Sequence, residues 1–304
     1  MKKQIEVSRI IEALKVVPLY ESTKKFVEID NSDINRPGLQ MAGFFEYFGK
    51  NRVQLFGMAE ITYMQELESD VLKERLDTFF SNSMPFTLIA RNLTPPSEFL
   101  ESAKAHDVPV LMSGMTTTKL AHSAILFLDN ELAPIIARHG GLMDIFGVGV
   151  FITGESGVGK SEASLELIKR GHRFVADDVV EIKKLTDSRL VGSSPEVIRH
   201  LMEIRGIGLI DVSVLYGMGS VMPEKDIEMC VFLEQGGDLN NNRLGAGDDR
   251  ITILGIEIPK ITIPVRPGRN IAIIIEVAAM NQRLKTRGYN ATDKLNQKII
   301  DLIG

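Results

Sequence analysis

The chain has 304 residues, of which 44% are apolar and 25% are charged, as is usual for a globular protein with a large core. Its formal charge of −5 disfavours a surface built to coat nucleic acid or an anionic membrane, and its single cysteine, Cys230, excludes an intrachain disulfide framework. The most apolar stretch, Ile271 to Met280, is short and contains Glu276, so no membrane span is predicted. We expect a cytoplasmic protein that binds neither nucleic acid nor membrane.

The first part of the chain predicts a small α/β domain over residues 1–130. Segments with helical spacing of apolar residues alternate with short apolar runs, which is typical of a partly parallel sheet. No catalytic constellation occurs here, so we expect a structural or regulatory domain. The predicted helices are Ile5–Leu14, Glu60–Leu72, Pro96–Ala105 and Thr118–Leu132, and the predicted strands are Val53–Phe56, Phe86–Ala90 and Val108–Met112.

The second part, residues 131–304, is richer in glycine and in β-branched residues. Several runs alternate with period 2, which favours an antiparallel or mixed sheet. The predicted strands are Val148–Thr153, Phe174–Ile182, Ile227–Leu233, Ile251–Ile258 and Ile261–Val265. The predicted helices are Ser161–Arg170, Ile271–Arg287 (whose first part could instead be a strand) and Ala291–Ile303. The whole chain is therefore expected to be an α/β protein of two domains.

A glycine-rich segment in the second part matches the phosphate-binding pattern G-x-x-x-x-G-K-[ST] at every fixed position. Its glycines let backbone N–H groups converge on phosphate, and the following helix adds partial positive charge. Lys160 can reach the outer phosphates, and the Ser161 hydroxyl can ligate Mg²⁺. We predict that ATP or pyrophosphate is bound by Gly154, Glu155, Ser156, Gly157, Val158, Gly159, Lys160 and Ser161.

Two adjacent carboxylates, Asp177 and Asp178, follow the next strand-like segment. A carboxylate beside a phosphate loop can hold Mg²⁺, and one within reach of an acceptor hydroxyl can take its proton. Adjacent residues of a regular strand point to opposite faces, so only one would face the nucleotide unless the strand ends or bulges there. Both could also be solvated loop residues.

Several segments together resemble the bifunctional HPr kinase/phosphorylase family of Gram-positive bacteria. The resemblance runs the whole length and is most specific in E-I-R-G-I-G and V-R-P-G-R-N. The segments that carry it are Ser32–Leu39, Gly154–Glu162, Asp177–Asp178, Met202–Asp211 and Val265–Asn270.

This resemblance implies a concrete function. Members of the family phosphorylate a serine of HPr, the small phosphocarrier of the sugar phosphotransferase system, with ATP and Mg²⁺. They also remove the phosphate by phosphorolysis, in which inorganic phosphate attacks and pyrophosphate is released. The family forms homohexamers through its C-terminal domain, controls carbon catabolite repression, and has a P-loop kinase domain resembling phosphoenolpyruvate carboxykinase.

The family roles transfer residue by residue. The resemblance implies that Asp178 accepts and returns the proton, with His139, Lys160 and Arg243 as further active-site residues. It implies that Ser161 and Glu203 ligate Mg²⁺, with Asp177 as a neighbouring metal-side carboxylate. The segment used in both activities is Met202, Glu203, Ile204, Arg205, Gly206, Ile207, Gly208, Leu209, Ile210 and Asp211. The segment implied mainly in phosphorolysis and in contact with a neighbouring subunit is Val265, Arg266, Pro267, Gly268, Arg269 and Asn270.

Taken alone, some of these residues have simpler interpretations. Glu203 could be a surface carboxylate paired with Arg205, and His139 could be a packed or solvated histidine. Arg243 could be a surface arginine, and it follows Asn242 where the family usually has aspartate. We interpret His172 and His200 as structural and Cys230 as a buried, inert thiol.

Two other functions compete with that of a serine kinase and phosphorylase. One is a P-loop kinase or carboxykinase-like enzyme that acts on a small metabolite. The other is a nucleotide sensor that binds a partner without chemistry, which a carboxylate beside the phosphate loop disfavours.

Overall fold

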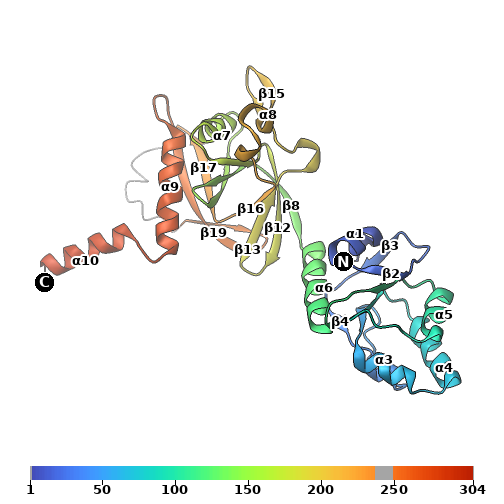
Figure 1. Cartoon of the computed structure of the whole chain (residues 1–304). Coiled ribbons are helices and arrows are strands. Elements are labelled where there is room, and N and C mark those ends of the chain that lie inside the picture. The colour runs from blue at the N-terminus through green and yellow to red at the C-terminus, as the bar shows by residue number, and fades with distance from the viewer. Residues whose placement is uncertain (1, 237–248, 304) are drawn as a thin grey trace. The chain divides into compact units, whose positions relative to one another are not determined.

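The computed structural model describes residues 2–236 and 249–303 and divides the chain into two units, residues 1–133 and 134–304 (Figure 1). The first unit extends past residue 130 because its last helix, α6 (Thr117–Leu132), continues to Leu132. Over the described ranges, no helix is long and apolar enough to cross a membrane.

The first unit is built on a sheet in the order β2-β7-β6-β5-β4, in which β4 to β7 are parallel and β2 is antiparallel to β7. Its inner strands alternate between two cores: Leu55 and Leu88 pack under α1 and α6, whereas Phe56 and Ile89 pack under α3 to α5. The remaining strands, β1 and β3, form an antiparallel pair. The strands are β1 (Lys3–Glu6), β2 (Val17–Tyr20), β3 (Phe26–Ile29), β4 (Ile34–Asn35), β5 (Val53–Phe56), β6 (Thr87–Ile89) and β7 (Val110–Met112), and the helices before α6 are α1 (Val7–Leu14), α2 (Gly38–Met41), α3 (Met58–Gln65), α4 (Ser69–Phe80) and α5 (Ser97–Ala105).

The second unit contains a mixed sheet in the order β11-β9-β10-β17-β19-β18 and an antiparallel sheet in the order β16-β13-β12-β8. The hairpin of β14 and β15 stands apart from both. The strands are β8 (Ile135–His139), β9 (Gly141–Ile145), β10 (Val148–Gly154), β11 (Arg173–Ala176), β12 (Val179–Thr186), β13 (Arg189–Ser193), β14 (Leu201–Ile204), β15 (Gly208–Asp211), β16 (Glu224–Asp226), β17 (Met229–Gln235), β18 (Arg250–Ile253) and β19 (Ile256–Val265). The helices are α7 (Lys160–Lys169), α8 (Val212–Tyr216), α9 (Ile271–Thr286) and α10 (Ala291–Ile303), with 3-10 turns at Glu196–Ile198 and Met218–Ser220.

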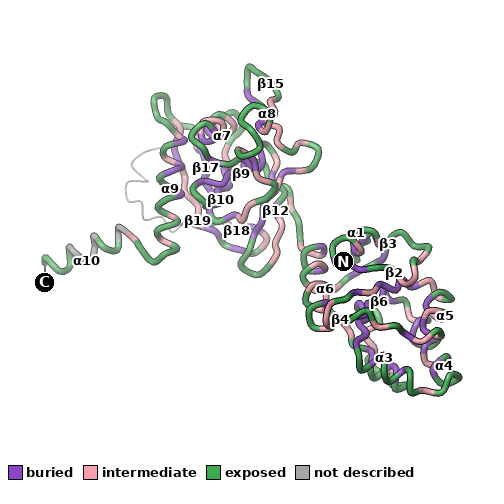
Figure 2. Tube along the Cα trace, in the orientation of Figure 1, coloured by how far each residue is buried: buried purple, intermediate pink, exposed green. Residues whose placement is uncertain are grey.

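The central strand β10 is buried over most of its length (Figure 2). Its side chains alternate between two cores. Val150 and Ile152 pack in one core with residues of α7 and α9, whereas Phe151 packs in the other with Val180 of the second sheet. The unit is therefore layered as helices, mixed sheet and antiparallel sheet. Because β10, β17 and β19 are parallel, their carboxyl ends meet at one edge of the mixed sheet.

Several predicted elements differ from the structure. The helix expected over Ile5–Leu14 begins at Val7, because Lys3–Glu6 pair with β3 as a strand. The helix expected over Glu60–Leu72 is interrupted between α3 and α4. The strand expected over Ile251–Ile258 is a hairpin whose second arm continues to Val265. The segment Ile271–Thr286 is helical from its start, which excludes the alternative of a strand there.

Candidate active site

The phosphate loop joins the carboxyl end of β10 to the first residue of α7. Gly154 has a φ of +149°, and a Cβ there would lie 2.3 Å from the carbonyl oxygen of Leu233 on the neighbouring strand β17. Only glycine therefore lets the chain leave β10 at this point without moving β17. The Lys160 ammonium curls back over the loop and donates hydrogen bonds to the carbonyl oxygens of Gly154 (3.2 Å) and Glu155 (2.9 Å).

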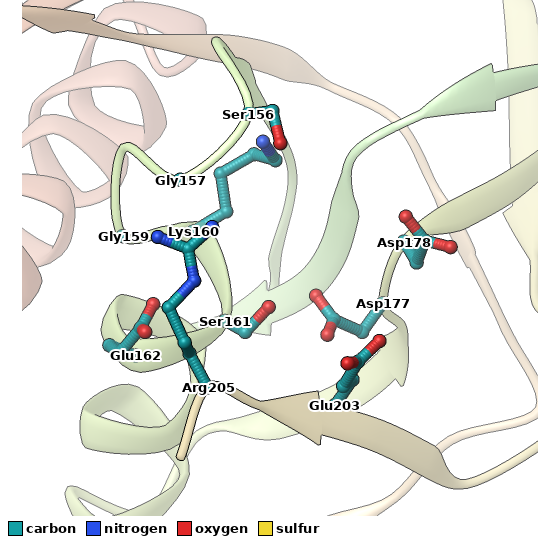
Figure 3. A pocket seen from close by; sticks show the side chains of 10 residues that line it. All are labelled: Ser156, Gly157, Gly159, Lys160, Ser161, Glu162, Asp177, Asp178, Glu203 and Arg205. Atoms are coloured by element: carbon teal, nitrogen blue, oxygen red, sulfur yellow. The ribbon is translucent and has the colours of Figure 1, made fainter. Parts of the chain in front are cut away.

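An open pocket of about 200 Å³ lies over this loop (Figure 3). Asp177, Asp178 and Glu203 lie on one side of it, and the loop lies on the other with Lys160, Arg205 and Glu162. This volume is too small for a whole nucleotide but suits phosphate groups, with the rest of a nucleotide extending into solvent. The lining residues are Ser156, Gly157, Gly159, Lys160, Ser161, Glu162, Asp177, Asp178, Glu203 and Arg205.

The two adjacent carboxylates line the pocket together because the predicted strand Phe174–Ile182 is broken at these two residues. Strand β11 ends at Ala176 and β12 begins at Val179, and Asp178 has a left-handed φ of +64°. Aspartate tolerates this conformation better than most residues. The alternative that the strand ends at this point is thus confirmed, and the single long strand is wrong.

Asp177 is the buried member of the pair, with 4% of its surface exposed. Burial raises the pKa of its carboxyl group above the usual range, since desolvation disfavours the charged form. Hydrogen bonds from the Ser161 hydroxyl and from the backbone N–H groups of Asp178 and Glu203 oppose that rise. Asp177 is therefore fixed in place between α7 and β14.

Asp178 is the exposed member, and it contacts His139. Strand β12 pairs with β8 so that Val179 is opposite His139, at the end of the antiparallel sheet. The His139 Nδ1 atom lies 3.1 Å from the Asp178 Oδ1 atom and 2.9 Å from the Asp178 carbonyl oxygen. Both side chains are largely exposed, so an incoming hydroxyl group can reach the carboxylate.

Three oxygen-bearing side chains could hold a divalent cation: Ser161 at the start of α7, Asp177 after β11, and Glu203 on β14. Figure 3 shows the Ser161 hydroxyl between Lys160 and Asp177, with Glu203 beside Asp177. Hard oxygen donors suit Mg²⁺, which usually keeps several waters and takes one or two carboxylates together with substrate phosphate. Within residues 2–236 and 249–303 no group of three His, Cys, Asp or Glu side chains forms a protein-only metal cage. The donor set thus fits Mg²⁺ bound jointly with phosphate.

Comparisons with known proteins decide the family. The models of the HPr serine kinase N terminus and of the HPr serine kinase C-terminal domain match residues 5–128 and 130–299, respectively. The chain belongs to the HPr serine kinase family. It is an enzyme of the kinase and phosphorylase class, and its two-domain α/β fold is that of this family.

Two relatives in this family align with this chain over nearly its whole length, and a solved structure aligns with about half of it. A protein named HPr kinase/phosphorylase from Thermoanaerobacter sp. (strain X514) is 48% identical over 302 residues, which cover 99% of each chain. One of the same name from Listeria monocytogenes serotype 4a (strain HCC23) is 47% identical over 305 residues, which cover 100% of this chain and 98% of the relative. The solved structure of the Hpr(Ser) kinase/phosphatase from Coxiella burnetii is 38% identical, with a TM-score of 0.48, over 53% of this chain and 98% of that one.

The segment Met202–Asp211, singled out by its resemblance to the HPr kinase family, is divided between the pocket and its support. Glu203 and Arg205 line the pocket, whereas the rest builds the hairpin of β14 and β15. Asp211 caps α8 by accepting hydrogen bonds from the backbone N–H groups of Ser213 (2.9 Å) and Val214 (3.1 Å). A hydrogen bond from the Ser213 hydroxyl group (2.6 Å), together with these backbone bonds, lowers the pKa of the Asp211 carboxyl group.

Several predicted parts of the site are not among the lining residues: Gly154, Glu155, Val158, His139 and the segment Val265–Asn270. The segment Val265–Asn270 forms the turn from β19 to α9, at the same sheet edge as the phosphate loop, and Asn270 caps α9. Arg243 lies outside the described residues.

Two lining residues were not identified one by one from the sequence motifs. Glu162 lines the pocket from the first turn of α7, and Arg205 was named only as part of a longer segment. Of the residues interpreted as structural, His172 is buried and bonded to Glu276 at 2.8 Å. Cys230 is buried in β17, and burial raises the pKa of its thiol to about 12, so the prediction of a buried thiol is confirmed.

Proposed function

We propose that this chain transfers the terminal phosphoryl group of ATP, with Mg²⁺, to a serine of the phosphocarrier protein HPr. In the opposite direction, inorganic phosphate removes that group and leaves as pyrophosphate. The names of the Thermoanaerobacter and Listeria relatives support HPr as the substrate. The observation that carries the chemistry is the exposed Asp178 carboxylate on the rim of a pocket formed by the phosphate loop.

Phosphate binding falls to the loop Gly154–Ser161. Its backbone N–H groups and the N-terminus of α7 attract the anion, and Lys160 can exchange its bonds to two loop carbonyl oxygens for bonds to phosphate. When bound, Mg²⁺ supplies positive charge beside the outer phosphates, and Ser161, Glu203 and Asp177 would hold it. Arg243 belongs to this proposal as a further phosphate-binding residue.

Proton transfer falls to Asp178. As the serine oxygen forms its bond to phosphorus and the bond to the leaving diphosphate breaks, Asp178 accepts the serine proton. In phosphorolysis an oxygen of inorganic phosphate forms the new bond, and Asp178 returns the proton to the departing serine oxygen. His139 orients the carboxylate through their contact at 3.1 Å.

We further propose that the active enzyme is a homohexamer assembled through its second unit, with Val265–Asn270 at a subunit contact. An exposed apolar stripe on α9 supports self-association: Ile273, Val277, Met280 and Leu284. All lining residues of the pocket belong to residues 134–304, which supports a structural or regulatory role for the first unit. The output of the reaction would be control of carbon catabolite repression.

The test is to mix the purified chain with Mg²⁺, ATP and HPr, and then to add inorganic phosphate. We expect one phosphoserine on HPr, followed by its loss with an equal amount of pyrophosphate. Omission of Mg²⁺ should abolish both steps. Labelling of a small acid or sugar in place of HPr, or ATP binding without any transfer, would overturn the proposal.

A further inference from the structure

The first unit contains an open groove of about 510 Å³ between α6 and the strand β4. Helix α6 packs against β4 and β5 (Figure 1), and β4 is the last strand in the order of its sheet. Part of one wall comes from Ser32–Leu39, a segment that the proposed function leaves without a role. A concave site of this size accommodates a small organic molecule.

The floor of the groove is apolar. Leu55 of β5 is buried at its base, and Ile34 of β4 is half-buried beside it. Ala121 and Ile125 are four residues apart on α6, so they share the face of the helix that lines the groove. Such a floor favours a ligand with a hydrocarbon or aromatic body, because that body leaves water when it lies there.

One end of the groove has an arginine that is fixed in place by a buried carboxylate. The Nε and Nη2 atoms of Arg36 donate hydrogen bonds to the two carboxylate oxygens of Glu60, at 3.1 and 2.7 Å. Glu60 is buried, and it also accepts a bond from the backbone N–H of Gly57 at 2.9 Å. A cation held in this way loses little conformational freedom when it binds a ligand.

Those two bonds leave the third nitrogen of Arg36, Nη1, available to a ligand. Within residues 2–236 and 249–303, Nη1 makes no hydrogen bond, and 47% of the side chain is exposed. The hydroxyl group of Thr117 lies at the same end: a Cβ on Gly57 would be 2.7 Å from Thr117 Oγ1 and 3.2 Å from Arg36 Nη2. Converging donors of this kind, one of them charged, suit a carboxylate or phosphate group.

The other end of the groove has no fixed cation. Arg52 lines it, but this arginine pairs with Asp33 at 3.1 Å, and both side chains are largely exposed. A surface pair of this kind is weak and its positions are not fixed. The groove follows α6 from Thr117 to Ile125, which at 1.5 Å per residue is about 12 Å. One anionic group with an apolar body of that length therefore matches the site.

We propose that this groove binds a small organic anion, whose carboxylate or phosphate group is bound by Arg36 and Thr117 and whose apolar body lies over Ile34 and Ala121. Binding is noncovalent, and no bond of the ligand is made or broken. The site gives the first unit a ligand of its own. It does not depend on phosphoryl transfer, so it can be tested separately from the proposed function.

The experiment measures the binding of octanoate and of octyl phosphate to the full chain by calorimetry. The comparison ligands are 1-octanol, which lacks the charge, and inorganic phosphate, which lacks the apolar body. We expect one of the two octyl anions to bind at least about 10-fold more tightly than either comparison ligand, the size of one charge-assisted hydrogen bond. The tighter of the two identifies the anionic group that the site prefers.

Arg36→Gln should weaken this binding about 10-fold, because it removes the charged donor. Arg9→Gln is the matched control: Arg9 is also an exposed arginine bonded to a buried glutamate, Glu131 (2.6 Å), but it does not line the groove. It should bind the anion as the wild type does.

Ala121→Leu is a second test, which leaves the pair of Arg36 and Glu60 intact. The larger side chain fills the floor and should also weaken binding about 10-fold, whereas Ala105→Leu, at an exposed position of α5 outside the groove, should not. No saturable binding of either octyl anion, equal affinity for 1-octanol, or equal affinities in each variant and its control would overturn the inference. Anion binding by a chain that transfers no phosphate to HPr would refute the proposed function and leave this site standing.

Discussion

At the scale of single residues, the pocket gives two adjacent carboxylates different environments. Asp177 is buried and bonded to Ser161 and two backbone N–H groups, whereas Asp178 is exposed and bonded to His139. The left-handed turn at Asp178 lets both line one pocket, which a regular strand would forbid. Separate environments suit the separate tasks proposed for them, in which the fixed group would lie beside the cation and the accessible group at the acceptor hydroxyl.

This division predicts the behaviour of Asp178→Asn. An amide of nearly the same shape cannot take the serine proton, so we expect both directions to slow by about 10³-fold. Because Asp178 lies on the rim and away from the loop backbone, Mg²⁺-ATP affinity should stay within a few-fold of wild type. Rates from radiolabelled HPr and affinities from calorimetry check both parts. A large loss of ATP affinity would show that Asp178 serves the nucleotide rather than the proton.

The close approach at Gly154 predicts a second residue-scale effect. Gly154→Ala would place a methyl group 2.3 Å from the Leu233 carbonyl oxygen, so the loop or β17 must shift and nucleotide binding should be lost. Gly147→Ala is the matched control, because Gly147 also has positive φ (+87°) but no atom within 4 Å of its added Cβ. We expect the control to bind Mg²⁺-ATP normally and to lose only about 1 kcal/mol of unfolding free energy. Equal ATP affinities in the two variants would contradict the role assigned to this contact.

At the scale of elements, the sequence pattern predicted the helices and strands that form through interactions between residues close together in the chain. The inner strands Val53–Phe56 and Val148–Thr153 and the helix after the phosphate loop were predicted because each is a continuous apolar or amphipathic run. The break between α3 and α4 was missed, since apolar residues continue with helical spacing on both sides of it. The strand Lys3–Glu6 was missed because its identity depends on pairing with Phe26–Ile29, at least 20 residues away.

The candidate site shows the same limit. The phosphate loop is contiguous in sequence, so its motif could be recognised directly. The contact of His139 with Asp178 depends on the pairing of β8 with β12, and the position of Arg205 over Gly157 depends on where the hairpin of β14 and β15 folds. No sequence spacing specifies either distance, so resemblance could group these residues but not orient them.

The position of α7, which begins at the phosphate loop, depends on one carboxylate of α9. Glu276 is buried and accepts hydrogen bonds from Arg170 at 2.9 and 2.7 Å and contacts His172 at 2.8 Å, just past the end of α7. The bonds from Arg170 outweigh desolvation and hold the pKa of the Glu276 carboxyl below its usual range. Its ionised form therefore stabilises the contact between the two helices.

Glu276→Gln should lower the unfolding free energy at pH 7 by about 1 kcal/mol, since the buried carboxylate loses its charge-assisted bonds to the exposed Arg170 side chain. The pKa of Glu276 is lower in the folded state than in the unfolded state, where it is about 4.3. The ionised carboxylate therefore stabilises the fold fully above that pH, and the stabilisation is lost as the pH falls through the folded-state pKa. The difference between wild type and variant should therefore shrink below about pH 4. Urea unfolding followed by circular dichroism measures it, because the chain has no tryptophan. Glu257→Gln, at an exposed position of β19, is the control, and an equal effect there would refute the argument.

At the scale of the whole molecule, the residues that line the pocket all come from the second unit, while the first unit has cores of its own. The pocket therefore lies in one separately packed part of the chain, and any structural or regulatory role of the first unit would lie in the other. Within the second unit, α9 buries Ala272, Ile275 and Ala279 against the core. Its other face is apolar as well, which a helix facing only water would not require.

That second face of α9 predicts how the chain associates. Ile273, Val277, Met280 and Leu284 recur at helical spacing and are each more than 40% exposed, so their burial would favour contact with a second copy. Val277→Glu places a charge in the middle of this stripe, and desolvating that charge in an interface would be costly. We expect the wild-type chain to sediment as a hexamer and Val277→Glu to sediment as smaller species at the same concentration. Val71→Glu, on an exposed position of α4 in the first unit, should leave the hexamer intact. Sedimentation of Val277→Glu as an intact hexamer would exclude α9 from the interface, because an unpaired carboxylate would not be tolerated at its centre.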